Sequence, residues 1–355
     1  MPTALFYDPY LDTLGGGERY TLTAAKVLSE HGFDVFLAWK DQRTLDAASQ
    51  RFHLDLSKIF LSSEYYRLFQ HGSIPARFQA LSPLDVVFYV SDGSVPVLFG
   101  KHTLLHYQVP FTHTNRHPFI DRLKLTTIRS IVVNSRFTKS VIDETLGINH
   151  STVLYPPIAV EEFSPGEKKD NLILNVGRFA SPLHSKRQDI LIQAFRGLYE
   201  QGTTNWRLVL AGGHQGPSKE LDHLKHLAKG LPVEFAVNTD YASLKKLYQS
   251  GSIYWHAAGF DVDEVLNPES TEHFGITTVE AMASGCVPVV VPKGGQKEIV
   301  ISKVGFHANT IPEFIAVTSH LIARPKLLKQ LSSQAIIRSR LYSQDKFASG
   351  LLSLC

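Results

Sequence analysis

The chain has 355 residues, of which 43% are hydrophobic and 19% charged, and its formal net charge is +3. This length exceeds one ordinary hydrophobic core and predicts two α/β domains, while the balanced composition excludes a disordered chain. The chain has no Lys/Arg-rich tract that would indicate nucleic-acid binding. It also has no apolar run near the roughly 18 to 20 residues that cross a bilayer. The mildly basic charge suits an anionic substrate or membrane surface.

The first half of the chain alternates short apolar runs with segments of helical spacing. We predict strands at 4–7, 34–38, 85–90, 103–106, 130–134 and 153–155, and helices at 18–30 and 136–146. This βαβ rhythm is typical of a parallel sheet with helices on both faces.

A proline-rich stretch at 155–166 predicts a linker between two domains, at 1–157 and 158–335. A second βαβ series follows it. We predict strands at 172–176, 207–211, 233–237, 252–256 and 287–291, helices at 187–200, 219–229 and 241–250, and a largely helical segment from 311 onward.

The stretch 268–285 carries the strongest functional signal. Glu272 and Glu280 bracket seven residues, and Gly275 stands just before a predicted helix start. A glycine-containing turn that enters a helix presents free backbone N–H groups and a positive dipole end, which favours a diphosphate. Carboxylates on either side of such an anion site can hold the hydroxyls of a sugar and of a ribose.

This stretch resembles the donor-site signature of retaining glycosyltransferases of the GT-B fold, which use nucleotide-activated sugars. The resemblance implies two Rossmann-like, doubly wound parallel-sheet domains that face a central cleft, and a helix at 336–355 that crosses back to the first domain. It places Glu272 on the donor sugar and Glu280 on the ribose. It also assigns substrate binding to His273, Phe274, Gly275, Ile276 and Thr277. Two solvated helix-end glutamates are the alternative interpretation.

A Leu-Gly-Gly-Gly-Glu sequence follows the first predicted strand and opens the first helix. Gly15, Gly16 and Gly17 let the backbone approach a ligand closely at a helix N-terminus. Their spacing is neither that of a dehydrogenase nor that of a Walker ATPase. They resemble the family's loop that faces the donor phosphates or the acceptor, and a tight strand-to-helix turn is the alternative.

Arg178 and Lys186 match the family's Gly-Arg and following Lys, after the first strand of the second domain. Two cations there neutralise a leaving nucleoside diphosphate. Arg187 is a further candidate for this role, and a pair of solvated cations before a helix is the alternative. Gly212 and Val237 lie where the family lines its nucleotide pocket.

His106 ends an apolar run of the first domain, and ligands of open α/β sheets gather at the carboxyl ends of strands. It resembles the family's histidine near the transferred sugar, and a core histidine is the alternative. Asp92 ends the preceding strand and is a candidate for positioning the acceptor or the sugar.

We expect no metal and no cofactor beside the nucleotide-sugar donor. None of the 16 histidines falls in a typical metal-ligand spacing, and the resemblance assigns charge neutralisation to Arg178, Lys186 and backbone amides. Asp261 and Asp263 form an Asp-x-Asp pair, which we interpret as loop residues.

The resemblance implies a metal-independent retaining enzyme that moves a hexose to a hydroxyl of a glycan, lipid-linked or small-molecule acceptor. The glycine-rich loop, the linker and the Glu-His-Phe-Gly block are most similar to mannosyltransferases of lipid-linked glycan assembly, which favours GDP-mannose, with UDP-linked sugars next. A non-catalytic GT-B protein and a GT-B enzyme of different chemistry are the alternatives.

Cys286 and Cys355 make no disulfide framework, and the N-terminus turns polar after a few residues. We therefore expect a cytoplasmic protein. The aromatic and basic stretch 60–81 is a candidate contact with a lipid-linked acceptor or with the inner face of a membrane, and a plain buried helix is the alternative.

Overall fold

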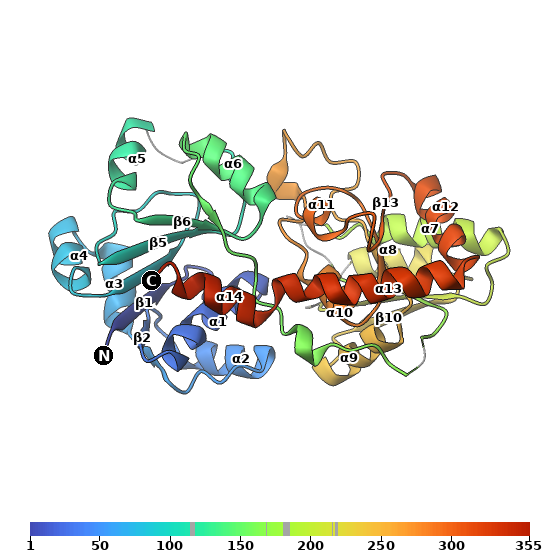
Figure 1. Ribbon diagram of the computed structural model, residues 1–355, viewed down its shortest axis with the longest axis horizontal. Coiled ribbons are helices and arrows are strands. Elements are labelled where there is room, and N and C mark those ends of the chain that lie inside the picture. The colour runs from blue at the N-terminus through green and yellow to red at the C-terminus, as the bar shows by residue number, and fades with distance from the viewer. Residues whose placement is uncertain (114–117, 168, 180–184, 215, 217–218) are drawn as a thin grey trace. The chain divides into compact units, whose positions relative to one another are not determined.

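In the computed structural model, residues 1–113, 118–167, 169–179, 185–214, 216 and 219–355 are described (Figure 1). The chain forms two compact units, Met1–Pro157 with Asp345–Cys355, and Ile158–Gln344. The second unit extends past the predicted boundary at residue 335, because helix α13 (Pro325–Ser339) runs across that position.

The described strands of the first unit form a seven-stranded parallel sheet in the order β3-β2-β1-β4-β5-β6-β7. They are β1 (Thr3–Tyr7), β2 (Asp34–Leu37), β3 (Ile59–Leu61), β4 (Val86–Val90), β5 (His102–Tyr107), β6 (Ser130–Val133) and β7 (Thr152–Val153). The short strand β3 was not predicted.

Helices cover both faces of this sheet. They are α1 (Gly16–Glu30), α2 (Gln42–Phe52), α3 (Ser63–His71), α4 (Ile74–Leu81), α5 (Pro118–Leu125), α6 (Arg136–Leu146) and α14 (Gln344–Leu352), with a short 3-10 helix at Leu11–Thr13. Helices α1, α2 and α14 share one buried core with Phe6 and Phe88 of the sheet. Helices α3, α4 and α6 cover the opposite face, where Leu5 and Leu105 point by strand alternation.

The stretch 60–81 contains the end of β3 followed by α3 and α4, rather than one buried helix. Phe69 and Leu81 are buried against the sheet, whereas Phe60, Ile74 and Phe78 are more than half exposed. The predicted burial therefore holds for one face of this pair of helices only.

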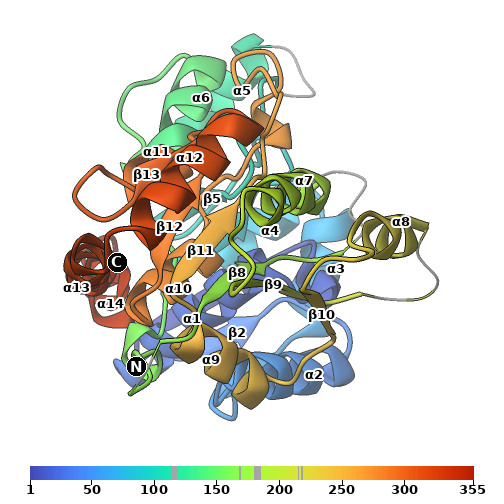
Figure 2. The same cartoon turned by 90° about the vertical axis from the view of Figure 1, so that its right-hand side faces the viewer.

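The second unit has a six-stranded parallel sheet in the order β10-β9-β8-β11-β12-β13 (Figure 2). Its strands are β8 (Leu172–Val176), β9 (Arg207–Gly212), β10 (Val233–Val237), β11 (Ile253–His256), β12 (Val287–Val290) and β13 (Phe306–His307). The predicted doubly wound parallel-sheet architecture is thus confirmed in both units.

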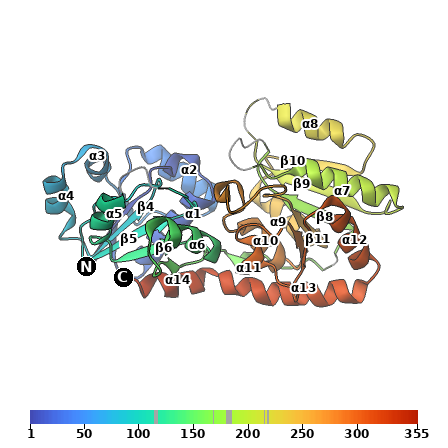
Figure 3. The same ribbon diagram turned by 90° about the horizontal axis from the view of Figure 1, so that it is seen from above.

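The helices of the second unit are α7 (Gln188–Glu200), α8 (Lys219–Leu227), α9 (Tyr241–Ser250), α10 (Ile276–Ala283), α11 (Gln296–Ile299), α12 (Ile311–Ile322) and α13, with 3-10 turns at Val160–Glu162, Pro268–Ser270 and Arg340–Tyr342. Helices α7 and α12 lie side by side (Figure 3) and share a core with Trp255 and α8. Tyr254, the neighbour of Trp255 in β11, points to the other face and reaches α10. None of the helices in the described part of the chain has the length and apolarity of a membrane span.

Candidate active site

The first turn of α10 lies at the carboxyl end of β8. The Tyr254 hydroxyl is 2.7 Å from Thr277 Oγ1 and 3.3 Å from the Val176 carbonyl oxygen, so it ties the start of the helix to the end of the strand. Gly275 caps the helix with φ +119°, and a Cβ there would meet the Gln296 amide, so this position requires glycine. The N–H groups that open α10, from Ile276 onward, therefore stand at the sheet edge where α/β folds bind anions.

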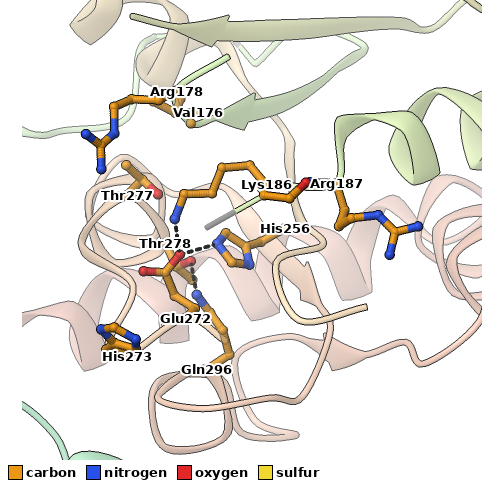
Figure 4. Close-up of polar contacts among 12 residues, drawn as sticks. Val176, Arg178, Lys186, Arg187, His256, Glu272, His273, Thr277, Thr278 and Gln296 are labelled. Carbon is orange, nitrogen blue, oxygen red and sulfur yellow. Dashed lines mark hydrogen bonds and ion pairs between the residues drawn. The ribbon is translucent and has the colours of Figure 1, made fainter. Parts of the chain in front are cut away.

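The loop before α10 places Glu272 between two donors (Figure 4). Its Oε2 accepts a hydrogen bond from Lys186 Nζ at 2.6 Å and another from His256 Nε2 at 2.9 Å. The His256 side chain is buried, and those of Lys186 and Glu272 are 20% and 18% exposed. Its other oxygen, Oε1, has no hydrogen-bond partner among the described residues. One carboxylate oxygen is thus held, and the other remains available to a substrate hydroxyl.

The charge of Glu272 follows from these contacts. Burial on its own would raise the pKa of this carboxyl, but Lys186 and the hydrogen bond from His256 outweigh it and hold the pKa well below its usual range. Glu272 is therefore a carboxylate at neutral pH.

Lys186 reaches Glu272 by crossing the end of β8. Its Cγ lies 2.9 Å from the position that a Cβ on Gly177 would occupy. Any side chain at Gly177 would push the lysine stem aside. The glycine of the Gly-Arg pair therefore shapes the path of the catalytic candidate Lys186.

The two arginines differ in their surroundings. Arg178 is exposed, and its guanidinium makes no hydrogen bond or ion pair with another residue that the structure describes. Arg187 instead pairs with Asp189 at 3.1 Å and donates to the Phe260 carbonyl at 2.8 Å. Figure 4 shows its guanidinium directed away from Glu272. The structure thus leaves Arg178 and Lys186, not Arg187, as the cations next to α10.

Glu280 lies within α10, four residues after Ile276, and is only 6% exposed. Its Oε2 accepts a hydrogen bond from the Tyr248 hydroxyl at 3.0 Å. The alternative of a solvated helix-end glutamate is therefore excluded for Glu280. Tyr248 is one of the groups that the sequence did not single out.

The residues between the two glutamates have structural partners. His273 Nε2 bonds the Glu269 carbonyl at 3.1 Å, and buried Phe274 packs edge-on against Tyr342. The Gly295 N–H donates to the Glu272 carbonyl at 2.8 Å. These contacts fix the backbone on which the Glu272 carboxylate is mounted.

A second close backbone approach lies at the ends of β8 and β9. A Cβ on Gly212 would meet the Gly177 carbonyl oxygen, so the two strand ends touch through glycine. Val237 pairs with Gly212 in the sheet, and the next residue, Asn238, accepts from the His214 N–H at 2.7 Å. Gly212 and Val237 thus border the same strand ends as Arg178.

The Asp-x-Asp pair lies in the loop after β11. Asp263 Oδ1 accepts the Val265 N–H at 2.9 Å, and Asp261 is 72% exposed and 3.9 Å from Arg187. Asp263 thus stabilises its own loop, and the exposed Asp261 lies opposite Arg187.

In the first unit, the predicted glycine loop enters α1. Gly15 is the N-cap, and its N–H donates to the carboxylate of Glu18 at the third helical position, as in one half of a capping box. A Cβ on Gly17 would meet the Gln108 side chain, whose Nε2 donates to the Gly17 carbonyl at 3.0 Å. Gly16 is the first residue of α1. The loop is a strand-to-helix turn held against Gln108, a residue that the sequence did not single out.

Asp8 lies directly after β1, beneath this loop, and is 1% exposed. It accepts hydrogen bonds from Thr21 Oγ1 at 2.7 Å and from the Tyr10 N–H at 3.0 Å. Burial, together with the nearby charge of Glu18, raises the pKa of Asp8 to about 7. Asp8 is another titratable group that the sequence pattern did not reveal.

His106 is completely buried in the core of the first unit. Its ring stacks on Tyr20 of α1 at 4.2 Å, and Nδ1 bonds the Val132 carbonyl at 3.1 Å. Burial lowers the pKa of His106 to about 3, so the ring is neutral. Strand alternation points this side chain at α1, and the structure favours the core-histidine alternative.

Asp92 is exposed and closes a local turn. Its Oδ1 accepts from both the N–H and the hydroxyl of Ser94, at 3.1 and 2.6 Å. This turn stands after β4, at the carboxyl edge where the glycine loop also lies.

The structure therefore brings Lys186, Glu272 and Thr277 together in the second unit, with Arg178 nearby, and places Gly15–Gly17 and Asp92 in the first. His256 lies at the centre of this site and was not predicted from the sequence. Its position as the last residue of a buried strand was the available signal, because ligands gather at carboxyl strand ends.

Two doubly wound parallel-sheet units, the second with the start of α10 beside Lys186 and Glu272, are the architecture of an α/β enzyme of the GT-B type. The family described as glycosyl transferases group 1 matches residues 159–337, and that described as glycosyltransferase family 4 matches residues 14–162. The chain belongs to the glycosyl transferases group 1 family, and it is a glycosyltransferase, as the sequence predicted.

Several known proteins are similar over nearly the whole chain. The GDP-Man:Man(3)GlcNAc(2)-PP-Dol alpha-1,2-mannosyltransferase of Xenopus laevis is 26% identical over 98% of this chain and 86% of its own length. The alpha-1,3/1,6-mannosyltransferase ALG2 of Mus musculus is 27% identical over 99% and 95%. A solved glycosyltransferase from Rickettsia africae ESF-5 has a TM-score of 0.77 at 18% identity, covering 99% of this chain and 97% of its own, and confirms the fold.

Proposed function

We propose that this glycosyltransferase moves mannose from GDP-mannose to a hydroxyl of a lipid-linked glycan, with retention of anomeric configuration and without a metal ion. The observation that carries the proposal is the arrangement of Lys186, Glu272 and His256 at the start of α10. It combines an anion site with a carboxylate that has one free oxygen.

The geometry suits departure of a nucleoside diphosphate. The Lys186 ammonium, the exposed Arg178 and the N–H groups that open α10 supply positive charge for the leaving phosphates. Glu272 Oε1 is placed to accept a hydrogen bond from a hydroxyl of the donor sugar. We assign Glu280 to the ribose and Val237 to the base of the donor.

In the proposed step the bond between the anomeric carbon and the phosphate oxygen breaks. The acceptor oxygen forms the new bond on the same face, and its proton passes to the departing phosphate. No protein base is required, which agrees with the complete burial of His106 in the core of the first unit. Positioning and charge stabilisation then supply the catalysis.

The choice of donor and acceptor is supported by the relatives. One of them is named for GDP-Man as donor and for Man(3)GlcNAc(2)-PP-Dol as acceptor. Their names give different linkages, alpha-1,2 in one and alpha-1,3/1,6 in the other, so our proposal specifies the acceptor class and not the linkage. A lipid-linked acceptor would place the enzyme at the cytoplasmic face of a membrane.

The donor is tested by thermal unfolding with GDP, UDP, ADP, TDP and their sugar conjugates, with and without EDTA. A ligand that binds only the native state raises the melting temperature by mass action. We expect a selective, EDTA-insensitive rise with GDP and GDP-mannose. A rise with UDP sugars alone would replace mannose by a UDP-linked hexose, and no rise with any nucleotide would favour a non-catalytic protein.

Retention is tested by NMR of the product made from GDP-α-mannose. An α-linkage in the first product formed supports the proposed step. A β-linkage would require attack from the opposite face and a protein base, and would overturn the proposed chemistry.

A further inference from the structure

Helix α5 of the first unit turns an apolar face to solvent. Phe119, Ile120 and Leu123 are 74%, 48% and 66% exposed. Ile120 and Leu123 follow Phe119 by one and four residues, so all three side chains lie on one side of the helix. Large apolar side chains gathered in this way on a surface mark an interaction site more often than isolated ones do.

A pocket of about 320 Å³ adjoins this face. Arg122 from α5, Arg129 before β6 and His150 after α6 line it with polar groups, and Leu125, Ile131 and Leu146 are among its apolar lining residues. It therefore combines an apolar interior with cationic groups, which is the complement of an anionic amphiphile.

The two arginines are not neutralised by the protein. The guanidinium groups of Arg122 and Arg129 make no hydrogen bond or ion pair with another described residue, and none of the described lining residues is acidic. Two aspartates of the neighbouring helices are paired with lysines instead. Asp121 lies 3.4 Å from Lys124, and Asp143 lies 2.7 Å from Lys139.

The apolar surface continues from the pocket to α4. Ile128 lines the pocket and also packs, as Phe99 does, against the cluster under α3 and α4. Phe99 contacts Phe78 edge-on at 5.1 Å, and the Phe78 side chain is 57% exposed. Phe99 and Ile128 therefore link the exposed apolar residues of α4 to those of α5.

This surface is distinct from the glycine loop. Arg129 precedes β6, at the amino edge of the parallel sheet, whereas Gly15, Asp92 and Gln108 follow strands at the carboxyl edge. The Arg129 side of the α5 surface therefore lies at the opposite edge of the sheet from the glycine loop.

We propose that the α5 face and its cationic pocket dock the first unit on an anionic phospholipid bilayer. Phe119, Ile120 and Leu123 enter the boundary between headgroups and acyl chains, and Arg122 and Arg129 bind the headgroup phosphates. The inference rests on the proposed work at a membrane, but not on the identity of the donor or acceptor.

The test is co-sedimentation of the full chain with vesicles of phosphatidylcholine alone and of phosphatidylcholine mixed with phosphatidylglycerol. We expect binding to the mixed vesicles that weakens with salt. The F119S/L123S and R122Q/R129Q double variants should each reduce it roughly tenfold or more. The matched control is I337S, because Ile337 on α13 is 57% exposed but belongs to the second unit.

A fluorescent reporter keeps the test independent of the stability of those variants. In F119W the new indole should shift its emission to shorter wavelength when mixed vesicles are added, while in I337W it should not. Vesicle binding without a shift in F119W, or equal binding to both kinds of vesicle, would overturn the proposed surface. Absence of any binding would overturn the membrane location too, while the nucleotide panel would still decide the donor.

A second copy of the chain is the competing occupant. Light scattering over a range of protein concentrations distinguishes it. A dimer that F119S/L123S abolishes would assign the α5 face to self-association and would contradict membrane docking.

Discussion

The imidazole of His256 and the ammonium of Lys186 both donate a hydrogen bond to the same carboxylate oxygen of Glu272. The histidine comes from the end of β11 and the glutamate from the loop before α10, so the contact joins the sheet to that loop. Because Nδ1 of His256 is buried without a partner among the described residues, the ring contributes one directed hydrogen bond, through Nε2. We therefore expect His256 to act as a positioning residue for Glu272.

His256→Ala should lower turnover by roughly 10- to 100-fold, because a hydrogen bond to a charged group is lost. His256→Gln retains a donor at a similar position and should recover most of the activity. The affinity for GDP, measured by calorimetry, should stay unchanged in both, since Glu272 is proposed to contact the sugar. Equal loss of GDP and GDP-mannose binding would indicate a merely structural role.

Lys186→Met keeps an unbranched stem across Gly177 and removes the charge. Turnover should fall by about 100- to 1,000-fold, because the cation next to the leaving phosphates is lost, while the melting temperature should move by only a few degrees. Glu272→Gln should behave similarly. Steady-state kinetics and thermal unfolding of the same preparations provide the measurements, and full activity in both variants would refute the site assignment.

The raised pKa of Asp8 predicts that the protein loses stability as the pH rises towards neutral. Its pKa in the folded protein, about 7, lies above the ordinary aspartate value of 3.8, so the folded state binds the proton more tightly than the unfolded chain does. The free energy of unfolding should therefore decrease as the pH rises from about 4 to about 7, by at most about 4 kcal/mol from this group. Asp8→Asn should remove this decrease. Urea unfolding at pH 5 and pH 8 checks it, and an identical slope in both proteins would contradict the assignment.

Gly212 and Gly213 offer a matched pair for the close approach of β8 and β9. A Cβ on Gly212 would meet the Gly177 backbone, whereas the nearest atom to one on Gly213 is Asn238 Oδ1 at 3.9 Å. Gly212→Ala should cost about 1 to 3 kcal/mol of stability, and Gly213→Ala less than about 1 kcal/mol. Denaturant unfolding of both variants decides whether the strand ends are as closely packed as described.

The parallel sheets were predictable because apolar runs such as 172–176 and 287–291 are buried on both faces and read clearly in the sequence. The strand β3 has only three residues, with Phe60 exposed, so its apolar signal was too weak. Glu272 and Lys186 were found through a local motif. His256 and Gln108 were not, because their partners lie 16 and 91 residues away and only the fold brings them together.

His106 illustrates the opposite difficulty. A histidine near the carboxyl end of a strand suggests a ligand contact, but one residue of register decides whether the side chain faces the sheet edge or the covering helix. Tyr20 from α1 occupies the space above this ring. Nothing in the local pattern around residue 106 specifies that neighbour.

Helix α14 has a consequence for biosynthesis. Phe347 and Leu351 complete a core otherwise built from the first 157 residues, with the whole second unit encoded between them. During translation the second unit can fold on emergence, whereas the first must wait with an unfilled groove next to Tyr20 until residues 345–355 are made. The first unit is therefore the last to complete its core. Loss of α14 would leave the first unit, but not the second, dependent on chaperones.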